Sequence, residues 1–213
     1  MRRSDLEAWL GRRFARVTTN AVVARPRLWR GFRWLTRAQF DRLAPVWDSM
    51  RRPEAFAALD RALDALPAAP KRVLDLGTGT GLAAFAAARR FPEAEVVGVD
   101  LAPGMIEQAR RNTPPELVER VRFEQADAAK LPFDEGAFDL VQLANMIPFF
   151  DELARVAAPG GHLVLSFSAG PETPIWVPPE RLRRELDGHG FTDFADFEAE
   201  GGTALLARKG DRL

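Results

Sequence analysis

Apolar residues at helical spacing dominate the first third of the chain. Positions three or four residues apart predict helices over residues 6–17, over 40–50 with an end or a kink at Pro45, and over 53–66. The stretch ARPRLWRGFRWL, between the first two, shows no clear period and gives no prediction. The segment LPAAPK at 66–71 is typical of a linker, so we expect a helical extension at residues 1–70 and a separate body at 71–213.

The pattern changes after residue 71 to short apolar runs that alternate with helical segments. The runs at 73–76, 96–99, 121–124, 140–143 and 163–167 predict strands, and the segments at 80–90, 103–112 and about 150–157 predict helices. A helix after Pro179 precedes two strand-like runs that meet at Gly201 and Gly202, which predicts a hairpin. The fold class is therefore α/β, with a mostly parallel sheet and helices on both faces.

Composition narrows the chemistry that the chain could perform. The 213 residues are 46% hydrophobic, which is enough for a buried core, and they include no cysteine and no tyrosine. Disulfides, thiolate metal sites and cysteine nucleophiles are thereby excluded. Acid–base chemistry would have to come from Asp, Glu, Lys, His162 or His189. Both histidines are more simply explained as structural, because neither has a partner that the sequence places beside it.

A formal net charge of zero hides an uneven distribution of charge. Residues 1–52 hold 13 arginines and four acidic residues, whereas the remainder holds 17 basic and 26 acidic residues. Such a segment could be attracted to an anionic membrane or an acidic substrate, although a solvated helical face is the simpler interpretation. No stretch approaches the roughly 20 apolar residues of a membrane span, and acidic residues interrupt the basic start. We therefore expect a soluble, cytoplasmic protein.

Three glycines follow the first predicted strand, in the sequence VLDLGTGTG. A strand, a glycine turn and a helix expose backbone N–H groups to a ligand at the carboxyl edge of a parallel sheet. A dinucleotide fingerprint would need glycine at its sixth position, where this chain has Leu82, and the Gly-Lys-Ser/Thr ending of a phosphate loop is absent. The turn alone is weak evidence for any one ligand.

Carboxylates at the ends of the next two strands sharpen the hypothesis. Asp100 ends the second strand, 19 residues after Gly81, where a carboxylate can accept hydrogen bonds from both ribose hydroxyls. It could also cap the following helix, a role that is compatible with ribose binding. Asp127 follows the third strand. Three successive strands thus deliver glycines or a carboxylate to one crevice.

At this point the chain resembles a known family. The segments VLDLGTGTG, VVGVDLAPGMIEQAR, EQADAAKLPFDEGAFDLV and ELARVAAPGGHLVLS are similar to successive motifs of class I S-adenosylmethionine-dependent methyltransferases, in their small-molecule branch. The resemblance implies a Rossmann-like, seven-stranded, mostly parallel sheet with an antiparallel last strand. It also implies S-adenosylmethionine as cofactor and no metal, and it is nearly silent on the acceptor.

The resemblance implies cofactor contacts position by position. Asp75 would lie near the ammonium group, Asp100 would hold the ribose hydroxyls, and Asp127 would accept from the adenine amino group. Asn145 would face the reactive end. The remaining contacts are main-chain or apolar: Gly77, Thr78, Gly79 and Gly81 beside the methionine moiety and ribose, Leu101 and Met105 against the adenine ring, and the backbone N–H of Ala128. Leu101 and Met105 could equally be core residues, and Thr78 and Thr80 could serve only local backbone groups.

Methyl transfer from a sulfonium is an in-line displacement that depends mainly on proximity and orientation. The segment NMIPFFDELARV after the fourth strand is shorter and more apolar than is usual in the family, which removes a common source of a catalytic base. Asp151 or Glu152 could serve as a base or only cap a helix, so no catalytic residue is assigned. Ile175 and Trp176 could form part of the acceptor pocket. An apolar or amphipathic acceptor with an anionic part is suggested by the apolar MIPFF segment, the basic start of the chain and four tryptophans, Trp29, Trp34, Trp47 and Trp176. The extension would lie over the crevice as a lid.

Two other classes of function stay open. A nicotinamide-dependent oxidoreductase shares the strand, glycine and acid pattern, but Leu82 and Asp127 argue against it. A non-catalytic relative that binds the cofactor, or has lost it, would explain the short connection after the fourth strand. Nucleic-acid modification is disfavoured, because no Asn-Pro-Pro-aromatic segment follows that strand.

Overall fold

The computed structural model describes residues 3–50 and 54–211, with side chains from residue 11 onward. The strands are β1 (Arg72–Leu76), β2 (Glu95–Asp100), β3 (Val121–Gln125), β4 (Phe138–Ala144), β5 (Ala157–Phe167), β6 (Phe191–Ala199) and β7 (Gly202–Lys209). The helices are α1 (Arg3–Ala24), α2 (Trp29–Leu43), α3 (Ala57–Asp64), α4 (Leu82–Arg90), α5 (Pro103–Asn112), α6 (Phe150–Val156) and α7 (Pro179–Gly188).

The strands of the described chain form one seven-stranded sheet in the order β3-β2-β1-β4-β5-β7-β6. Pairings among the first five strands are parallel, and β7 runs antiparallel to both β5 and β6. The predicted fold class, with its antiparallel last strand, is confirmed. Because the order reverses between β1 and β4, the carboxyl ends of the central strands open a crevice where such sheets bind ligands.

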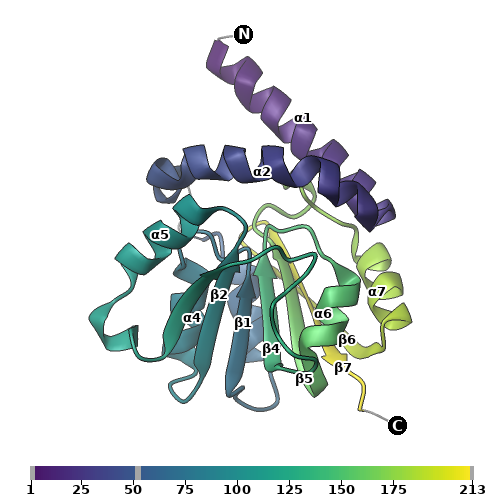
Figure 1. Ribbon diagram of the computed structural model, residues 1–213. Helices are drawn as coiled ribbons and strands as arrows, with labels where there is room; N and C mark the ends of the chain where they lie inside the picture. Colours follow the sequence, from purple (N-terminus) through teal and green to yellow (C-terminus); the bar gives the residue numbers. More distant parts are fainter. Residues whose placement is uncertain (1–2, 51–53, 212–213) are drawn as a thin grey trace.

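Helices cover both faces of the sheet because alternate strand residues point to opposite sides. On one face, Val73 of β1 and Val96 of β2 pack with apolar residues of α3, α4 and α5. On the other face, Leu74 and Val97 pack with residues of α6 and α7. Figure 1 shows these layers on either side of the strands.

The extension has two parts with different positions. In Figure 1, α2 lies across the top of the sheet and α1 projects away from it at an angle. By contrast, α3 packs on the sheet itself, with Leu59 and Leu63 buried in the core. The division of the chain at residue 70 stays a prediction, although α3 shares the core of the body.

The predicted helix over 6–17 lies within α1, and the predicted end at Pro45 is confirmed, because α2 stops at Leu43. The stretch without a prediction forms a 3₁₀ turn at Pro26–Leu28 and then α2. The proline predicted to open the third helix, Pro53, lies outside the described residues. No described helix is long and apolar enough to cross a membrane.

Candidate cofactor site

The glycine turn lies between β1 and α4, at the carboxyl edge of the sheet. Gly77, Gly79 and Gly81 have φ angles of 67°, 54° and 92°, a region that L side chains rarely adopt. On the crevice side, a Cβ on Gly77 would lie 2.9 Å from the sulfur of Met146, and one on Gly79 would lie 3.3 Å from Nε1 of Trp47. The bare main chain of Gly77 and Gly79 thus lies on the crevice side, where Met146 and Trp47 pack against it.

Gly81 has a different role from the other two glycines. A Cβ at this position would lie 2.8 Å from the rings of both Phe85 and Phe123, which pack edge to face. Gly81 also begins α4 as its N-cap residue. Packing in the core explains why this position is a glycine, and no ligand contact is needed to explain it.

Asp75 is almost fully buried at 1% exposure, directly before the turn. Its carboxylate accepts hydrogen bonds from the hydroxyl of Thr78 and, at 3.1 Å, from the side-chain amide of Gln142 in β4. The alternative that Thr78 serves only backbone groups is wrong, because its hydroxyl donates to a carboxylate. Sequence reasoning missed Gln142, since an isolated amide within an apolar strand gives no motif.

Asp100 lies at the end of β2, as predicted, and touches the turn. Its two carboxylate oxygens accept hydrogen bonds from the backbone N–H of Gly79 at 3.0 Å and of Ala102 at 2.9 Å. Burial raises the pKa of Asp100 above its ordinary value, although these N–H groups partly offset the effect, and the nearby Asp41 carboxylate adds to the rise. The bond to Ala102, the N-cap residue of α5, shows that Asp100 also supports that helix.

Asp127 follows β3 and pairs with the extension. Its Oδ1 accepts a hydrogen bond of 2.8 Å from Nε1 of Trp29, the first residue of α2, and another from the backbone N–H of Ala129. The guanidinium of Arg33 lies 3.7 Å from the other oxygen. Sequence reasoning could not find the partner of Asp127, because 98 residues separate it from Trp29.

The predicted adenine contacts are divided between two apolar clusters that involve the extension. Leu101 and Ala128 pack against a cluster that contains Trp29 and Phe149. Met105 is 1% exposed and packs with Ala44 and Ala102, beside Trp47. The alternative that these are core residues fits Met105 better than Leu101, which is only partly buried.

Asn145 has a φ of 54° just beyond β4, and both ends of its side-chain amide are used. Its Oδ1 accepts from the backbone N–H of Ser168 at 2.9 Å, and its Nδ2 donates to the hydroxyl of Ser168 at 3.0 Å. The structure therefore uses Asn145 to join the ends of β4 and β5. Contact with a cofactor stays a prediction for this residue, as for the other candidate site residues.

Neither candidate base faces the crevice freely. Burial favours the neutral form of Glu152, but hydrogen bonds from Arg155 and the backbone N–H of Leu131 outweigh it, so the pKa of Glu152 lies below its usual range. Asp151 lies 3.0 Å from Nε2 of His189, at the contact between α6 and α7. Glu152 supports the local fold, the Asp151 side chain is largely exposed beside His189, and the structure singles out neither as a base.

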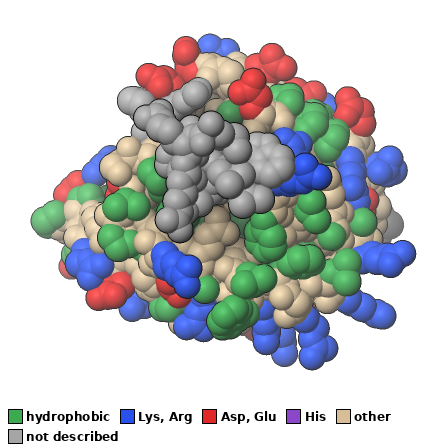
Figure 2. Space-filling view, turned by 90° about the horizontal axis from the view of Figure 1, so that it is seen from above, with side chains coloured by type: hydrophobic (Ala, Val, Ile, Leu, Met, Phe, Trp, Pro, Cys, Tyr) green, Lys and Arg blue, Asp and Glu red, His purple; other side chains and the backbone are tan. Residues whose placement is uncertain are grey.

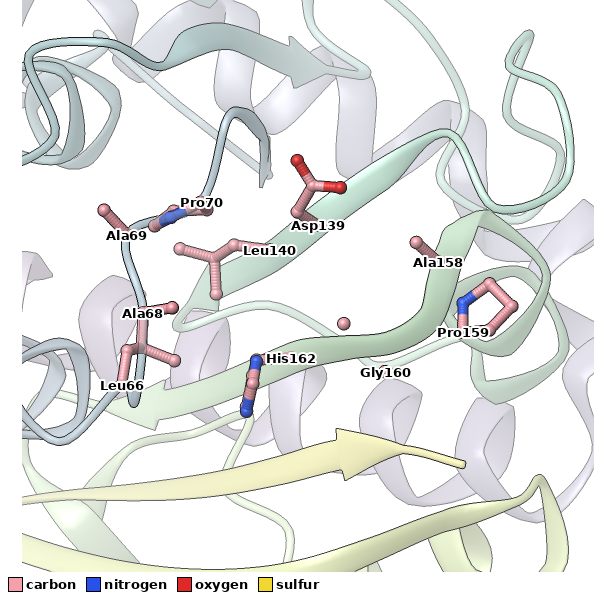
Figure 3. Close-up of a pocket in the computed structure, with 11 residues that line it drawn as sticks. Leu66, Ala68, Ala69, Pro70, Asp139, Leu140, Ala158, Pro159, Gly160 and His162 are labelled. Atoms are coloured by element: carbon pink, nitrogen blue, oxygen red, sulfur yellow. The ribbon is translucent and has the colours of Figure 1, made fainter. Parts of the chain in front are cut away.

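A hollow lies away from the candidate cofactor site, between the linker and the start of β5 (Figure 3). It is lined by small residues and by Asp139 and His162. Asp139 is already paired with the guanidinium of Arg72 and two backbone N–H groups. Among the side chains that the structure describes, no group of three or more His, Cys, Asp or Glu could hold a metal ion.

Comparison with known proteins supports the family that the motifs suggested. Residues 73–161 match the family described as "methyltransferase domain". The chain is 47% identical to a demethylmenaquinone methyltransferase of Thermus thermophilus over 138 residues. This matched stretch is 59% of this chain and 62% of the relative. A malonyl-[acyl-carrier protein] O-methyltransferase of Halorhodospira halophila is 40% identical over 147 residues, or 64% of this chain and 48% of the relative. The chain thus spans about half to three fifths of the length of these curated relatives.

Solved structures agree on the fold. A SAM-dependent methyltransferase from Aquifex aeolicus superposes with a TM-score of 0.64 at 18% identity, over 76% of this chain and 95% of that one. The phosphoethanolamine N-methyltransferase 2 of Haemonchus contortus, in complex with S-adenosyl-L-methionine, superposes with a TM-score of 0.61 at 19% identity. The superposition covers 74% of this chain and 52% of that one. The chain has the fold of the class I S-adenosylmethionine-dependent methyltransferases, and its residues 73–161 match a methyltransferase domain.

Proposed function

We propose that this chain binds S-adenosylmethionine in the crevice and transfers its methyl group to a small apolar or amphipathic acceptor. The proposal rests on Asp127, whose carboxylate accepts a hydrogen bond from a flat heteroaromatic N–H within an apolar cluster. An adenine amino group offers the same kind of donor on a flat ring, so the residues present fit the nucleoside. Asp100 would accept from the ribose hydroxyls, and the main chain at Gly77 and Gly79 would lie beside the methionine moiety.

Bound S-adenosylmethionine supplies a methyl group carried on a positively charged sulfur. When the methyl group is transferred, the rest of the donor leaves as a neutral thioether. The chain's own task is then to hold the acceptor in line with that methyl group and to keep water out. Such alignment alone can lower a barrier by roughly 7–11 kcal/mol. No base is assigned, because the candidate carboxylates Asp151 and Glu152 already have partners.

Unpaired polar atoms beside apolar residues support an amphipathic acceptor. The indole N–H of Trp176 is buried without a hydrogen-bond partner among the described residues, as are the hydroxyls of Thr18 and Thr19 in α1. Arg16 of α1 donates to the carbonyls of Pro171 and Thr173, which ties these two segments together. A polar group of the acceptor could form hydrogen bonds with such atoms while its apolar part packs nearby.

The curated relatives suggest which acceptors to try. They are a demethylmenaquinone methyltransferase, a malonyl-[acyl-carrier protein] O-methyltransferase and a trans-aconitate 2-methyltransferase.

Calorimetric titration with S-adenosylhomocysteine tests the cofactor site. Asp100→Ala should weaken binding by about 1–3 kcal/mol, or roughly 5- to 150-fold, since the ribose hydroxyls lose their acceptor. Asp134→Ala, which removes an exposed carboxylate from another loop, is the matched control and should bind like the wild type. Unchanged affinity in a folded Asp100→Ala protein would remove Asp100 from the site.

The same preparation separates the alternative functions. Binding of NADH in place of S-adenosylhomocysteine would indicate the oxidoreductase. Binding of S-adenosylmethionine without release of S-adenosylhomocysteine, across acceptors of the three classes named by the relatives, would favour the non-catalytic alternative.

Contact with an anionic membrane stays a separate prediction. Trp34 is 70% exposed and Leu35 47% exposed on the outer side of α2, near the exposed Arg30. Figure 2, which looks down on this end, shows hydrophobic and basic side chains mixed over the surface. Burial of apolar side chains in the bilayer and attraction of arginines to anionic lipids would act together at such a face. We expect the chain to float with anionic but not with neutral vesicles, and Trp34→Ala with Leu35→Ala to float less. Equal recovery of wild type and double variant would contradict this.

A further inference from the structure

The extension places its own side chains where the nucleoside is expected. Trp29 is 7% exposed, donates to Asp127 at 2.8 Å, and packs edge to face on Phe149 with ring centroids 5.4 Å apart. Leu101 and Ala128, two of the residues expected to contact adenine, pack against the same cluster. One indole therefore uses the acceptor and the apolar surroundings predicted for the adenine ring.

The next part of the extension covers the glycine turn. The indole Nε1 of Trp47 lies 3.3 Å from the point where a Cβ on Gly79 would be, so it faces the bare main chain expected to contact the cofactor. Asp48 accepts a hydrogen bond from the hydroxyl of Thr80 at 2.5 Å, in the same turn.

The contact continues along α5. The carboxylate of Asp41 accepts a hydrogen bond of 2.9 Å from the backbone N–H of Gly104, in the first turn of that helix. Ala44 is buried against Met105. From Trp29 to Asp48, the extension thus takes up contacts at the predicted adenine pocket and at part of the glycine turn.

We propose that residues 29–48 compete with the nucleoside for the crevice, with Trp29 in the place of the adenine ring. This inference rests on the proposed function, because it assumes that the crevice is the cofactor site. Two flat rings cannot share the acceptor and the apolar surroundings at Asp127, so the extension moves away when the cofactor binds. The apparent affinity for the cofactor is then lowered by the fraction of molecules in the closed arrangement.

Trp29→Ala tests the competition directly. Removing the indole raises the open fraction, so the dissociation constant for S-adenosylhomocysteine should fall by about tenfold. Trp34→Ala is the matched control, because Trp34 lies on the same helix but is 70% exposed, and it should bind like the wild type. If the wild type binds and Trp29→Ala binds equally or more weakly, the competition is overturned. If neither binds, the proposed function fails and takes this inference with it.

A reversible tether gives a second test that does not depend on how Trp29→Ala folds. An ideal Cβ at Gly104 would lie 3.5 Å from Cβ of Ala44, within the usual disulfide range of about 3.5–4.5 Å. The chain has no cysteine of its own, so Ala44→Cys with Gly104→Cys can form only this disulfide within one molecule. The oxidised protein, with the extension held in place, should bind S-adenosylhomocysteine at least about tenfold more weakly than the reduced protein.

Each single-cysteine variant serves as the control for the reagents and should bind equally under both conditions. Equal affinity of the oxidised and reduced double variant would show that the extension need not move, which would overturn the competition while leaving the cofactor site intact.

Discussion

At the level of single residues, the three glycines of the turn differ in what requires them. Gly77 and Gly79 face Met146 and Trp47 on the crevice side, whereas Gly81 faces the rings of Phe85 and Phe123 in the core. The sequence motif does not distinguish the three glycines. The structure shows that one glycine of the pattern packs in the core, whereas cofactor contact at the other two stays a prediction.

Gly81→Ala should therefore destabilise the fold whether or not a cofactor binds. The left-handed backbone, with φ of 92°, and the 2.8 Å approach to two rings together cost about 2–4 kcal/mol. Urea unfolding checks this, with Gly31→Ala as control, because Gly31 lies in α2 with no atom within 4 Å of an added Cβ. The control should not be destabilised, since alanine is favoured over glycine in a helix by about 1 kcal/mol. Equal midpoints for Gly81→Ala and wild type would show that the rings make room.

At the level of elements, the strands and the helices of the body were predictable because each has one apolar period. The arginine-rich stretch before Pro45 was not, because α2 carries apolar residues on opposite sides. Trp29 is buried against the body, whereas Trp34 and Leu35 point to solvent. The two sets obscure the helical period, so only the tertiary contact at Trp29 shows which side of α2 faces inward.

The predicted lid is the element whose contacts the sequence described least. The sequence led us to expect the extension as a lid over the crevice, but the pairing of Trp29 with Asp127 joins residues with no local pattern in common. The apolar MIPFF segment was interpreted as a sign of an apolar acceptor. In the structure Phe149 of this segment packs on Trp29, so part of its apolar character serves to hold the extension.

At the level of the whole molecule, charge is divided between the extension and the body. Residues 1–52 carry an excess of nine positive charges and the remainder an equal excess of negative ones. The guanidinium of Arg33 near Asp127 is one place where the two parts meet. Attraction between the oppositely charged parts should favour the closed arrangement, in addition to the apolar contacts of Trp29 and Trp47.

Salt should therefore loosen the extension without loosening the sheet. Raising sodium chloride from about 0.1 M to about 1 M shortens the screening length from about 10 Å to about 3 Å, which weakens attraction between exposed charges. Amide hydrogen exchange should then show lower protection in α2, while β1 and β4, which are held by buried apolar residues, keep theirs in the same sample. Apolar contacts do not weaken in salt, so unchanged or increased protection of α2 would mean that Trp29 and its neighbours, and not the division of charge, hold the extension over the crevice.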